Sequence, residues 1–359
     1  MIRSRLSRRI ADWVRGKFTR PPSPPLQPRR GPVSHVIILD GTMSSLEPGQ
    51  ETNAGLAYKL CLQQGKGVSV YYEPGIQWKD WRTASDVMMG RGINRQIRRA
   101  YGFLASRYRP GDRIYLMGYS RGAFAVRSLA GIIDMVGLLR PEHATVRNIR
   151  DIYRHYECSP DSEGARVFAD RLCQPEVTIE MIGVWDTVKA LGLRLPLLWK
   201  FSAPRHEFHN HHLGPAIRNG FQALALNETR MVYEPVLWDS IEGWHGRVEQ
   251  VWFRGTHGDV GGQIGGLEAA RPLANIPFVW MMEQAEACGL PLPQGWQAQF
   301  PCDANAPSAG SWRGNGKWFW LRRPRVVGST QSEHVHSTAK TALENPGWFN
   351  WSGAGRPVA

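Results

Sequence analysis

The residue with the clearest chemical potential is Ser120, which stands between Gly118 and Gly122 in the sequence YLMGYSRGAFAV. An apolar run at 113–117 precedes it, and a helix-like run at 122–138 follows it. A nucleophilic serine projects from a sharp strand-to-helix turn, which leaves room only for small residues two positions before and after it. The two glycines meet that requirement, so the pattern predicts a nucleophile elbow with Ser120 as the attacking group.

An activated serine needs a general base and an acid that orients the base, both from later strand ends. The apolar segment IEMIGVW ends at Asp186, and EQVWFRGTHGDVGG carries His257 and Asp259 in a glycine-rich loop. We expect Asp186 as the triad acid, His257 as the base and Asp259 as support for the loop. A helix N-cap or turn acid is the structural alternative for each aspartate. Two other late histidines compete for the role of base, His334 and His336.

The oxyanion of an acyl-transfer reaction needs N–H donors aimed at it. One is the N–H of Arg121, which follows the nucleophile at the positive end of the helix that begins there. A second donor comes from the loop after an earlier strand. Because Asp40, Gly41 and Thr42 follow the apolar run VIIL, we predict that Gly41 and Thr42 supply this donor and that Asp40 holds the loop.

Neither a metal nor an organic cofactor is expected for this chemistry. The segment RHEFHNHHLG resembles a metal cluster, but it lacks regular ligand spacing and nearby cysteines, so we reject a metal site there. Its histidines are His206, His209, His211 and His212. The cysteines are scattered and form no CxxC pair, which indicates reduced thiols in a cytoplasm-like compartment. They are Cys61, Cys158, Cys173, Cys288 and Cys302.

Apolar runs alternate with helix-like segments along the chain. This order predicts an α/β fold of the α/β-hydrolase type, a mostly parallel sheet with helices on both faces. The expected strands are 33–39, 68–72, 113–117, 177–185 and 250–253, and the expected helices are 93–107, 122–138 and 277–288. We assign 33–359 to one hydrolase domain, with helical cover insertions over the site around 138–175 and 193–238.

The N-terminal segment differs in composition from the rest. Residues 1–30 hold nine Lys or Arg and one Asp, a net +8 of the formal +13. In residues 1–20 apolar side chains recur at helical spacing among the basic ones, which predicts a basic amphipathic helix suited to an anionic membrane surface. A helix docked on its own domain, a disordered tail and an organelle transit peptide are the alternatives. Residues 21–32, PPSPPLQPRRGP, are typical of a stiff proline-rich linker.

Location and partners follow from the same composition. No apolar run reaches the ~18–20 residues of a spanning helix, and the N-terminus lacks the apolar centre of a signal peptide. We expect a cytoplasmic protein, either peripheral at the membrane or exported by a signal-independent secretion system. Nucleic acid is not an expected partner, because no binding motif accompanies the basic tail. Lipid contact or core packing could each explain GLRLPLLW at 192–199 and the segment 311–325, where a hairpin would place Trp318 and Trp320 on one face.

Several motifs together resemble a known family. In chain order they are VIILDGT, YYEPG, INRQIRRAYGFLASRYRPGDRIYLMGYSRGAFAVRSLAG, IGVWDTVKALG, ALALNETRMVYEPVLW and EQVWFRGTHGDVGG. From about Val33 to Leu290 the sequence is similar to the catalytic domain of the type VI secretion phospholipase effectors, a bacterial branch of the α/β-hydrolases. The resemblance implies Ser120 as nucleophile, Asp186 as acid and His257 as base. It also implies an ester substrate, which for the effectors is the acyl chains of phospholipids.

Three positions depart from the family pattern. Tyr119 stands where the family usually has Phe, Gly258 where it often has Ser, and Gln263 where it often has a third Gly. The expected function is a serine esterase of the lipase or phospholipase type, acting through an acyl-enzyme. Two alternatives stay open: an inactive hydrolase fold that binds a partner, and an acyl hydrolase for a non-lipid ester or amide.

Overall fold

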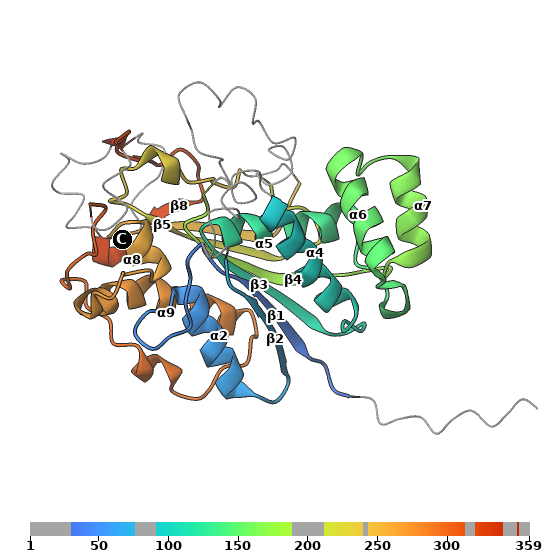
Figure 1. The fold of residues 1–359 in the computed structure, drawn as a ribbon, viewed down its shortest axis with the longest axis horizontal. Helices are drawn as coiled ribbons and strands as arrows, with labels where there is room; N and C mark the ends of the chain where they lie inside the picture. Colours follow the sequence, from blue (N-terminus) through green and yellow to red (C-terminus); the bar gives the residue numbers. More distant parts are fainter. Residues whose placement is uncertain are drawn as a thin grey trace, which may run out of the picture. The chain divides into compact units, whose positions relative to one another are not determined.

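A seven-stranded parallel sheet forms the centre of the unit Val33–Ala359, one of two units into which the chain divides (Figure 1). The computed structural model describes residues 30–75, 91–188, 212–239, 243–312, 320–339 and 350–351. In spatial order the strands are β2 (Val68–Glu73), β1 (Ser34–Leu39), β3 (Arg113–Tyr119), β4 (Ile179–Trp185), β5 (Asn219–Ala225), β6 (Arg247–Phe253) and β8 (Glu333–Val335). All neighbouring strands pair in parallel, so each connection between neighbours must cross a face of the sheet. The short strands β7 (Val326–Val327) and β9 (Asn350–Trp351) form a separate parallel pair.

The crossover connections carry the helices. They are α2 (Asn53–Gln64), α4 (Arg91–Ala105), α5 (Arg121–Met135), α6 (Val146–Cys158), α7 (Glu163–Leu172), α8 (His257–Gly261) and α9 (Arg271–Ala287). Short 3₁₀ turns lie between them: η1 (Pro141–His143), η3 (Met231–Tyr233), η4 (Glu268–Ala270), η5 (Trp296–Gln299) and η7 (Ser337–Ala339). In Figure 1, α4 and α5 cover one face of the sheet, and α2 and α9 cover the other.

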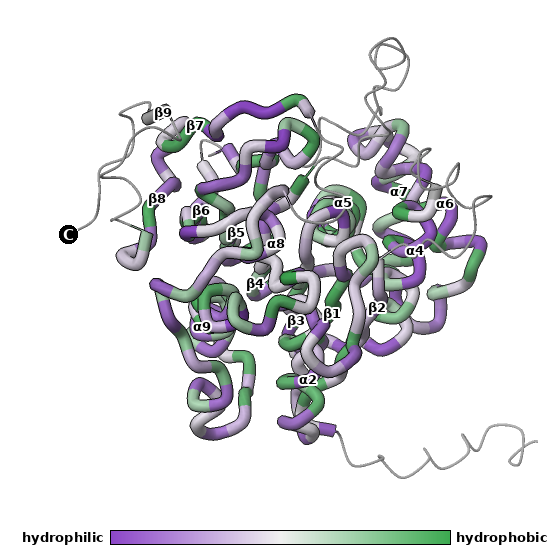
Figure 2. The backbone as a smooth tube through the Cα atoms, turned by 60° about the vertical axis from the view of Figure 1, so that its left-hand side comes forward, coloured by the Kyte–Doolittle hydropathy of each residue, from purple (hydrophilic) through white to green (hydrophobic). Residues whose placement is uncertain are grey.

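The side chains of β1 explain why both faces are covered. Val36 and Ile38 belong to the core shared with α2 and α9, whereas Ile37 and Leu39 belong to the core shared with α4 and α5. Alternate side chains of a strand point to opposite faces, so an unbroken apolar run such as VIIL requires a helix layer on each side. Figure 2 shows this hydrophobic run along β1, between helices of mixed hydropathy.

The predicted α/β-hydrolase-like fold is confirmed. All five predicted strands and two of the three predicted helices form, with ends shifted by up to three residues. The third helix, α9, begins at Arg271 rather than at the predicted 277. Proline is common in the first turn of a helix, and it is Pro272 that occupies that place, whereas Pro277 lies inside the helix.

One of the two predicted cover insertions is corrected by the structure. Within 193–238, the residues Asn219–Ala225 form β5, a central strand between β4 and β6, rather than helical cover. The sequence NGFQALA hides this strand, because it has no β-branched residue and carries a glutamine that is buried. Hydrogen bonds satisfy the buried side chain of Gln222. Its amide N–H donates to the carbonyl of Val236 at 3.0 Å, and its amide oxygen accepts from the hydroxyl of Thr187 at 3.2 Å.

The other predicted insertion, 138–175, is helical, but it lies away from Ser120. It holds α6 and α7, and α6 packs on α4 and on the later part of α5, where Tyr156 approaches Gly131. Gly131 lies eleven residues beyond Ser120, a distance of about 16 Å along a helix axis. The helices α6 and α7 therefore extend the helical layer formed by α4 and α5, and they do not cover the elbow.

Several predictions fall outside the described residues. These are the amphipathic helix 1–20, most of the linker 21–32, the segment 192–199 and the hairpin tip with Trp318. Within the part of the chain that is described, no helix combines the length and the apolar character needed to cross a membrane.

Candidate active site

The elbow at Ser120 lies where β3 ends and α5 begins. Ser120 has φ 56° and ψ −120°, a backbone conformation that residues other than glycine rarely adopt. The crowding of the turn explains the glycines on either side. A Cβ at Gly118 would lie 2.8 Å from the backbone of Ala123, and a Cβ at Gly122 would lie 2.1 Å from the carbonyl oxygen of Leu39. Any side chain at either position would displace the neighbouring backbone.

The structure brings Ser120, His257 and Asp186 together. His257 Nε2 lies 2.9 Å from Ser120 Oγ, and His257 Nδ1 lies 2.5 Å from Asp186 Oδ2. The three residues follow β3, β6 and β4, whose carboxyl ends meet at one edge of the parallel sheet. All three are buried, with exposed fractions of 7% for Ser120, 4% for His257 and 0% for Asp186. The predicted nucleophile, base and acid thus form one connected chain of hydrogen bonds.

Asp186 fixes which nitrogen of the imidazole carries the proton. Burial by itself raises the pKa of Asp186, but the Arg325 guanidinium and the hydrogen bond from His257 outweigh burial and hold that pKa well below its usual range. A carboxylate can only accept hydrogen bonds, so Nδ1 of His257 is the donor to Asp186. Nε2 therefore keeps its lone pair and accepts from the hydroxyl of Ser120, which is the geometry of a general base.

Two tyrosine rings hold the imidazole of His257 in place. Tyr233 stacks on it with ring centres 4.5 Å apart and planes 20° apart, and Tyr119 packs on it at 4.9 Å and 31°. The Tyr119 hydroxyl also donates to the His257 carbonyl at 3.2 Å. A phenylalanine at position 119 would pack in the same way but could not make this hydrogen bond.

A buried ion pair holds the backbone where the His257 helix begins. Glu228, 1% exposed, accepts from the His257 N–H at 3.2 Å and pairs with Arg230, whose Nη2 lies 2.6 Å from Glu228 Oε2. Burial raises the pKa of Glu228, but Arg230 more than offsets it, so the net shift is downward. The carboxylate therefore stays charged at the His257 backbone N–H, with its charge matched by the guanidinium.

Asp40 organises the loop predicted to face the oxyanion. Its buried carboxylate accepts from the Gly41 N–H at 2.6 Å, the Thr52 hydroxyl at 2.6 Å and the Tyr72 hydroxyl at 2.7 Å. Burial raises the pKa of Asp40 to about 6, although these hydrogen bonds oppose the shift. The loop also lies against Ser120, because a Cβ at Gly41 would be 3.4 Å from Ser120 Cβ.

The predicted oxyanion donors differ in their availability. The N–H of Gly41 is already used by Asp40, whereas no acceptor among the described residues takes the N–H of Thr42 or of Arg121. Gln263 steadies this loop, since its amide donates to the carbonyls of Thr42 at 3.0 Å and Met43 at 3.3 Å. The glycine often found at position 263 in the family pattern could not make this connection between the two loops.

Asp259 occupies the loop-supporting position expected of it. Its carboxylate accepts from the N–H of Thr256 at 2.7 Å and the hydroxyl of Thr256 at 2.9 Å. It also accepts from the Ser308 hydroxyl at 2.5 Å and the Ala309 N–H at 2.7 Å. Four donors on one buried carboxylate tie the turn that carries His257 to a segment fifty residues later in the chain.

The rival histidines lie elsewhere. His336 Nδ1 is 2.8 Å from Thr338 Oγ1, its ring stacks on Phe253 at 4.7 Å, and burial lowers its pKa. His334 lies in β8. In the described parts of the chain, no hydrogen bond connects either histidine to Ser120.

The histidine-rich segment is described only from His212 onward. His206, His209 and His211 lie outside the described residues, and His212 forms a β-bridge with Asp239. Among the residues that the structure describes, no three His, Cys, Asp or Glu side chains are grouped as a metal ion would require. The cysteines are all free.

Four residues of the site were missed by sequence reasoning: Arg325, Tyr233, Glu228 and Gln263. Each acts through a long-range contact, and Arg325 lies 139 positions from its partner Asp186. A weak signal existed for Glu228 and Tyr233, because both lie in the segment ALALNETRMVYEPVLW that carried part of the family resemblance. No local pattern marked Arg325, which lies among other arginines in LRRPR.

The parallel sheet, with Ser120 on its strand-to-helix turn, defines an α/β-hydrolase-like protein. A family model described as T6SS, Phospholipase effector Tle1-like, catalytic domain, matches residues 34–284. The chain belongs to this family, as its motifs predicted.

Relatives of the chain extend well beyond the matched part. An uncharacterized protein of Saccharomyces cerevisiae is 32% identical over 184 residues, which cover 44% of this chain and 27% of the yeast protein. The crystal structure of an uncharacterized protein from Pseudomonas aeruginosa aligns with 76% of this chain and 49% of its own, at 16% identity and a TM-score of 0.41. A structure of the Tle1 effector bound to the VgrG spike of the type VI secretion system aligns with 66% and 52%, at 18% identity and a TM-score of 0.33. The chain thus spans about a quarter of the yeast relative and about half of each solved structure.

Proposed function

We propose that the protein is a serine hydrolase that cleaves carboxylic esters, with the acyl esters of phospholipids as the substrate class. The observation that carries the proposal is the chain of contacts from Ser120 Oγ to His257 Nε2 at 2.9 Å and from His257 Nδ1 to Asp186 at 2.5 Å. The family description, a phospholipase effector catalytic domain, supports the choice of substrate.

The proposed reaction has two steps. Ser120 Oγ attacks the ester carbonyl while His257 Nε2 takes its proton, and Asp186 stabilises the imidazolium. His257 then returns the proton to the leaving alcohol, which leaves an acyl group on Ser120. In the second step His257 activates a water that attacks the acyl-enzyme, which releases the fatty acid and regenerates the serine.

The oxyanion of both steps needs donors beside Ser120. The N–H of Arg121 begins α5, so the positive end of the helix dipole lies at the nucleophile. The N–H of Thr42 is the second donor in this proposal, because the N–H of Gly41 is taken by Asp40. The two N–H groups would stabilise the developing negative charge, and removing one such donor typically lowers kcat about 10²–10³-fold.

Location and partners are part of the same proposal. A phospholipase must reach a membrane surface, and the basic segment 1–20 would supply attraction to anionic lipid. The effector description of the family supports export by a type VI secretion route.

Covalent labelling with a fluorophosphonate probe tests the activated serine directly. We expect the wild-type protein to be labelled, and both Ser120→Ala and His257→Ala to abolish labelling while the proteins stay folded. Ser128→Ala is the matched control, since Ser128 lies in the same helix and donates to the carbonyl of Phe124 at 3.1 Å. Labelling that survives in Ser120→Ala would place the reactive nucleophile elsewhere and overturn the assignment of Ser120. A folded wild type that is never labelled would favour a binding module.

Substrate class is tested separately, with phospholipid vesicles and with soluble esters of increasing acyl length. Release of fatty acid from vesicles by the wild type, and not by Ser120→Ala, is the expected result. Hydrolysis of the soluble esters without any preference for long acyl chains, and no release of fatty acid from vesicles, would instead indicate an acyl hydrolase for a non-lipid ester or amide.

A further inference from the structure

Arg325 contacts Asp186, the proposed triad acid, through both terminal nitrogens of its guanidinium. Its Nη1 donates to Asp186 Oδ1 at 2.5 Å, and its Nη2 donates to Asp186 Oδ2 at 2.9 Å. This two-pronged pairing is the strong, orientation-fixing form of an arginine–carboxylate contact. Asp186 Oδ2 is shared, because the same oxygen also accepts from His257 Nδ1.

We propose that Arg325 is a positioning residue of the triad, which orients the carboxylate of Asp186 and, through its charge, sets the pH at which His257 can accept a proton. This inference rests on the proposed function of the triad. It adds a fourth member from a segment that lies beyond the family match at residues 34–284.

The guanidinium is itself held rigidly. It is 7% exposed, and in addition to Asp186 it donates to the carbonyls of Ala225 at 2.9 Å and Tyr233. Ala225 ends β5, and Tyr233 is the residue that stacks on His257. Arg325 therefore joins the triad acid to the segment that packs on the base, and a shift of the arginine would disturb both.

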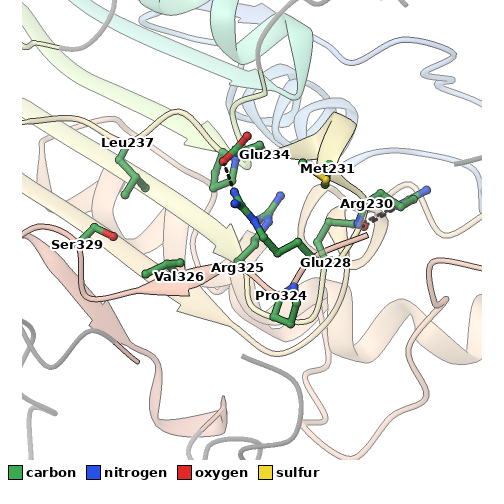
Figure 3. Close-up of a pocket in the computed structure, with 11 residues that line it drawn as sticks. Glu228, Arg230, Met231, Glu234, Leu237, Pro324, Arg325, Val326 and Ser329 are labelled. Carbon is green, nitrogen blue, oxygen red and sulfur yellow. Dashed lines mark hydrogen bonds and ion pairs between the residues drawn. The ribbon is translucent and has the colours of Figure 1, made fainter. Parts of the chain in front are cut away.

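Figure 3 shows Arg325 in the wall of a pocket, near Glu228, Arg230 and Glu234. Arg230 is paired with Glu228, and Glu234 is paired with Arg323, which lines the same pocket. Arg323 thus offers a matched comparison. It lies two residues from Arg325 and carries the same charge, but its ion pair is exposed and does not involve the triad.

The charges around His257 decide the direction of the effect. The titratable groups in contact with the ring are Asp186 at the end of β4, Tyr119 at the end of β3 and Tyr233 in η3. The Glu228–Arg230 pair after β5 contacts the backbone N–H of His257. Asp186 favours the protonated imidazolium, whereas a cation on the same carboxylate opposes it. Removing the charge of Arg325 should therefore let the imidazole keep its proton to higher pH.

The size of the shift follows from the distance. Arg325 Nη2 lies 2.9 Å and His257 Nδ1 lies 2.5 Å from the shared Oδ2 of Asp186, so the two nitrogens are at most about 5.4 Å apart. Over about 5 Å, Coulomb's law gives about 0.6 pH unit at the dielectric constant of water and about 2.4 units at an effective value of 20. We expect a shift of about 1–2 units.

The experiment is a titration of the His257 ring by NMR in histidine-labelled protein, assigned with His257→Ala. The proteins compared are the wild type, Arg325→Met, Arg325→Lys and the control Arg323→Met. This readout needs no substrate, so it gives a result even if the protein hydrolyses no ester. In parallel, the pH profile of the second-order labelling rate reports whether the same ring limits the activation of Ser120.

In Arg325→Met we expect the midpoint of the titration, and the acidic limb of the labelling profile, to move about 1–2 units to higher pH. The plateau of the labelling rate should fall by up to about 100-fold, as misplacement of a catalytic group by 1 Å can do. Arg325→Lys keeps the charge and loses the paired geometry, so its midpoint should stay near that of the wild type while its plateau falls. Arg323→Met should match the wild type in both.

The proposal is overturned if Arg325→Met titrates at the wild-type midpoint or below it, even if its labelling rate has dropped. If Arg325→Met does not fold, Arg325→Lys decides the question. A midpoint shifted upward despite the retained charge, or an undiminished plateau, would contradict the assigned role. Failure of the proposed function would look different, because the wild type itself would then not be labelled at Ser120.

Discussion

Replacement of Gly122 by alanine tests whether the elbow and the Asp40–Thr42 loop are packed as tightly as the structure indicates. The new Cβ would lie 2.1 Å from the carbonyl oxygen of Leu39 and 2.5 Å from that of Asp40. An ordinary contact between carbon and oxygen is about 3.3 Å or longer. The end of β1 and the start of α5 must therefore separate by about 1 Å, which draws the loop away from Ser120.

The expected consequence is mainly kinetic. Misplacement by 1 Å of groups that bind the transition state can lower the rate about 10²-fold, which is about 2.7 kcal/mol of lost stabilisation. Overpacking also destabilises a fold by about 1–3 kcal/mol, partly offset by the gain of up to about 1 kcal/mol when alanine replaces glycine in a helix. We expect a protein that folds with a slightly reduced free energy of unfolding and is labelled by a fluorophosphonate about 100-fold more slowly.

Gly131→Ala is the matched control, because it places the same methyl group in the same helix. There the new Cβ would meet the side chain of Tyr156 at 3.0–3.1 Å rather than backbone, so a movement of that side chain by a few tenths of an ångström would be enough to accept it. Its labelling rate should equal that of the wild type, and urea unfolding should show that both variants are folded. The reasoning is refuted if Gly122→Ala is labelled at the wild-type rate, since the loop would then not depend on the close approach.

Two further predictions concern the carboxylates that hold the loops. Because burial raises the pKa of Asp40 from 3.8 to about 6, the folded state binds a proton that the unfolded chain has lost, so stability falls as pH rises from about 4 to about 6. The free energy of unfolding of the wild type should fall by about 2 kcal/mol over that range relative to Asp40→Asn, measured by urea unfolding, and parallel pH dependences would contradict it. Asp259→Asn must set an amide N–H₂ against donors from Thr256, Ser308 or Ala309, so we expect a loss of about 1–3 kcal/mol of stability together with slower labelling. An unchanged free energy of unfolding would show that the four hydrogen bonds do not brace the turn.

The local parts of the fold could be predicted from the sequence because periodicity reports burial directly. The run VIIL in β1 is apolar on both faces, and a strand with that pattern must lie inside a parallel sheet covered on both sides. The elbow was predictable for a similar reason, since the backbone around Ser120 admits only glycine at two fixed positions. In both cases the constraint acts within a few residues, where the sequence records it.

The region 193–238 was harder to predict, because some of its buried side chains are polar. In β5 the polar Gln222 is fully buried and is satisfied by the backbone of Val236, so the strand lacks the uniform apolar pattern that marked β1. A strand with a buried polar side chain cannot be told from a loop by its apolar pattern alone. The residues of β5 were therefore predicted as part of the cover insertion 193–238.

The C-terminal segment completes the site in a way that no family motif reveals. The family match covers residues 34–284, which include Ser120, Asp186 and His257. Two residues that support the acid and the base, Ser308 and Arg325, lie beyond it. Ser308 braces the turn that carries His257, and Arg325 neutralises the buried carboxylate of Asp186. A domain cut at residue 284 would therefore keep all three proposed triad residues and lose both the guanidinium that orients the carboxylate of Asp186 and the hydroxyl that braces the His257 turn.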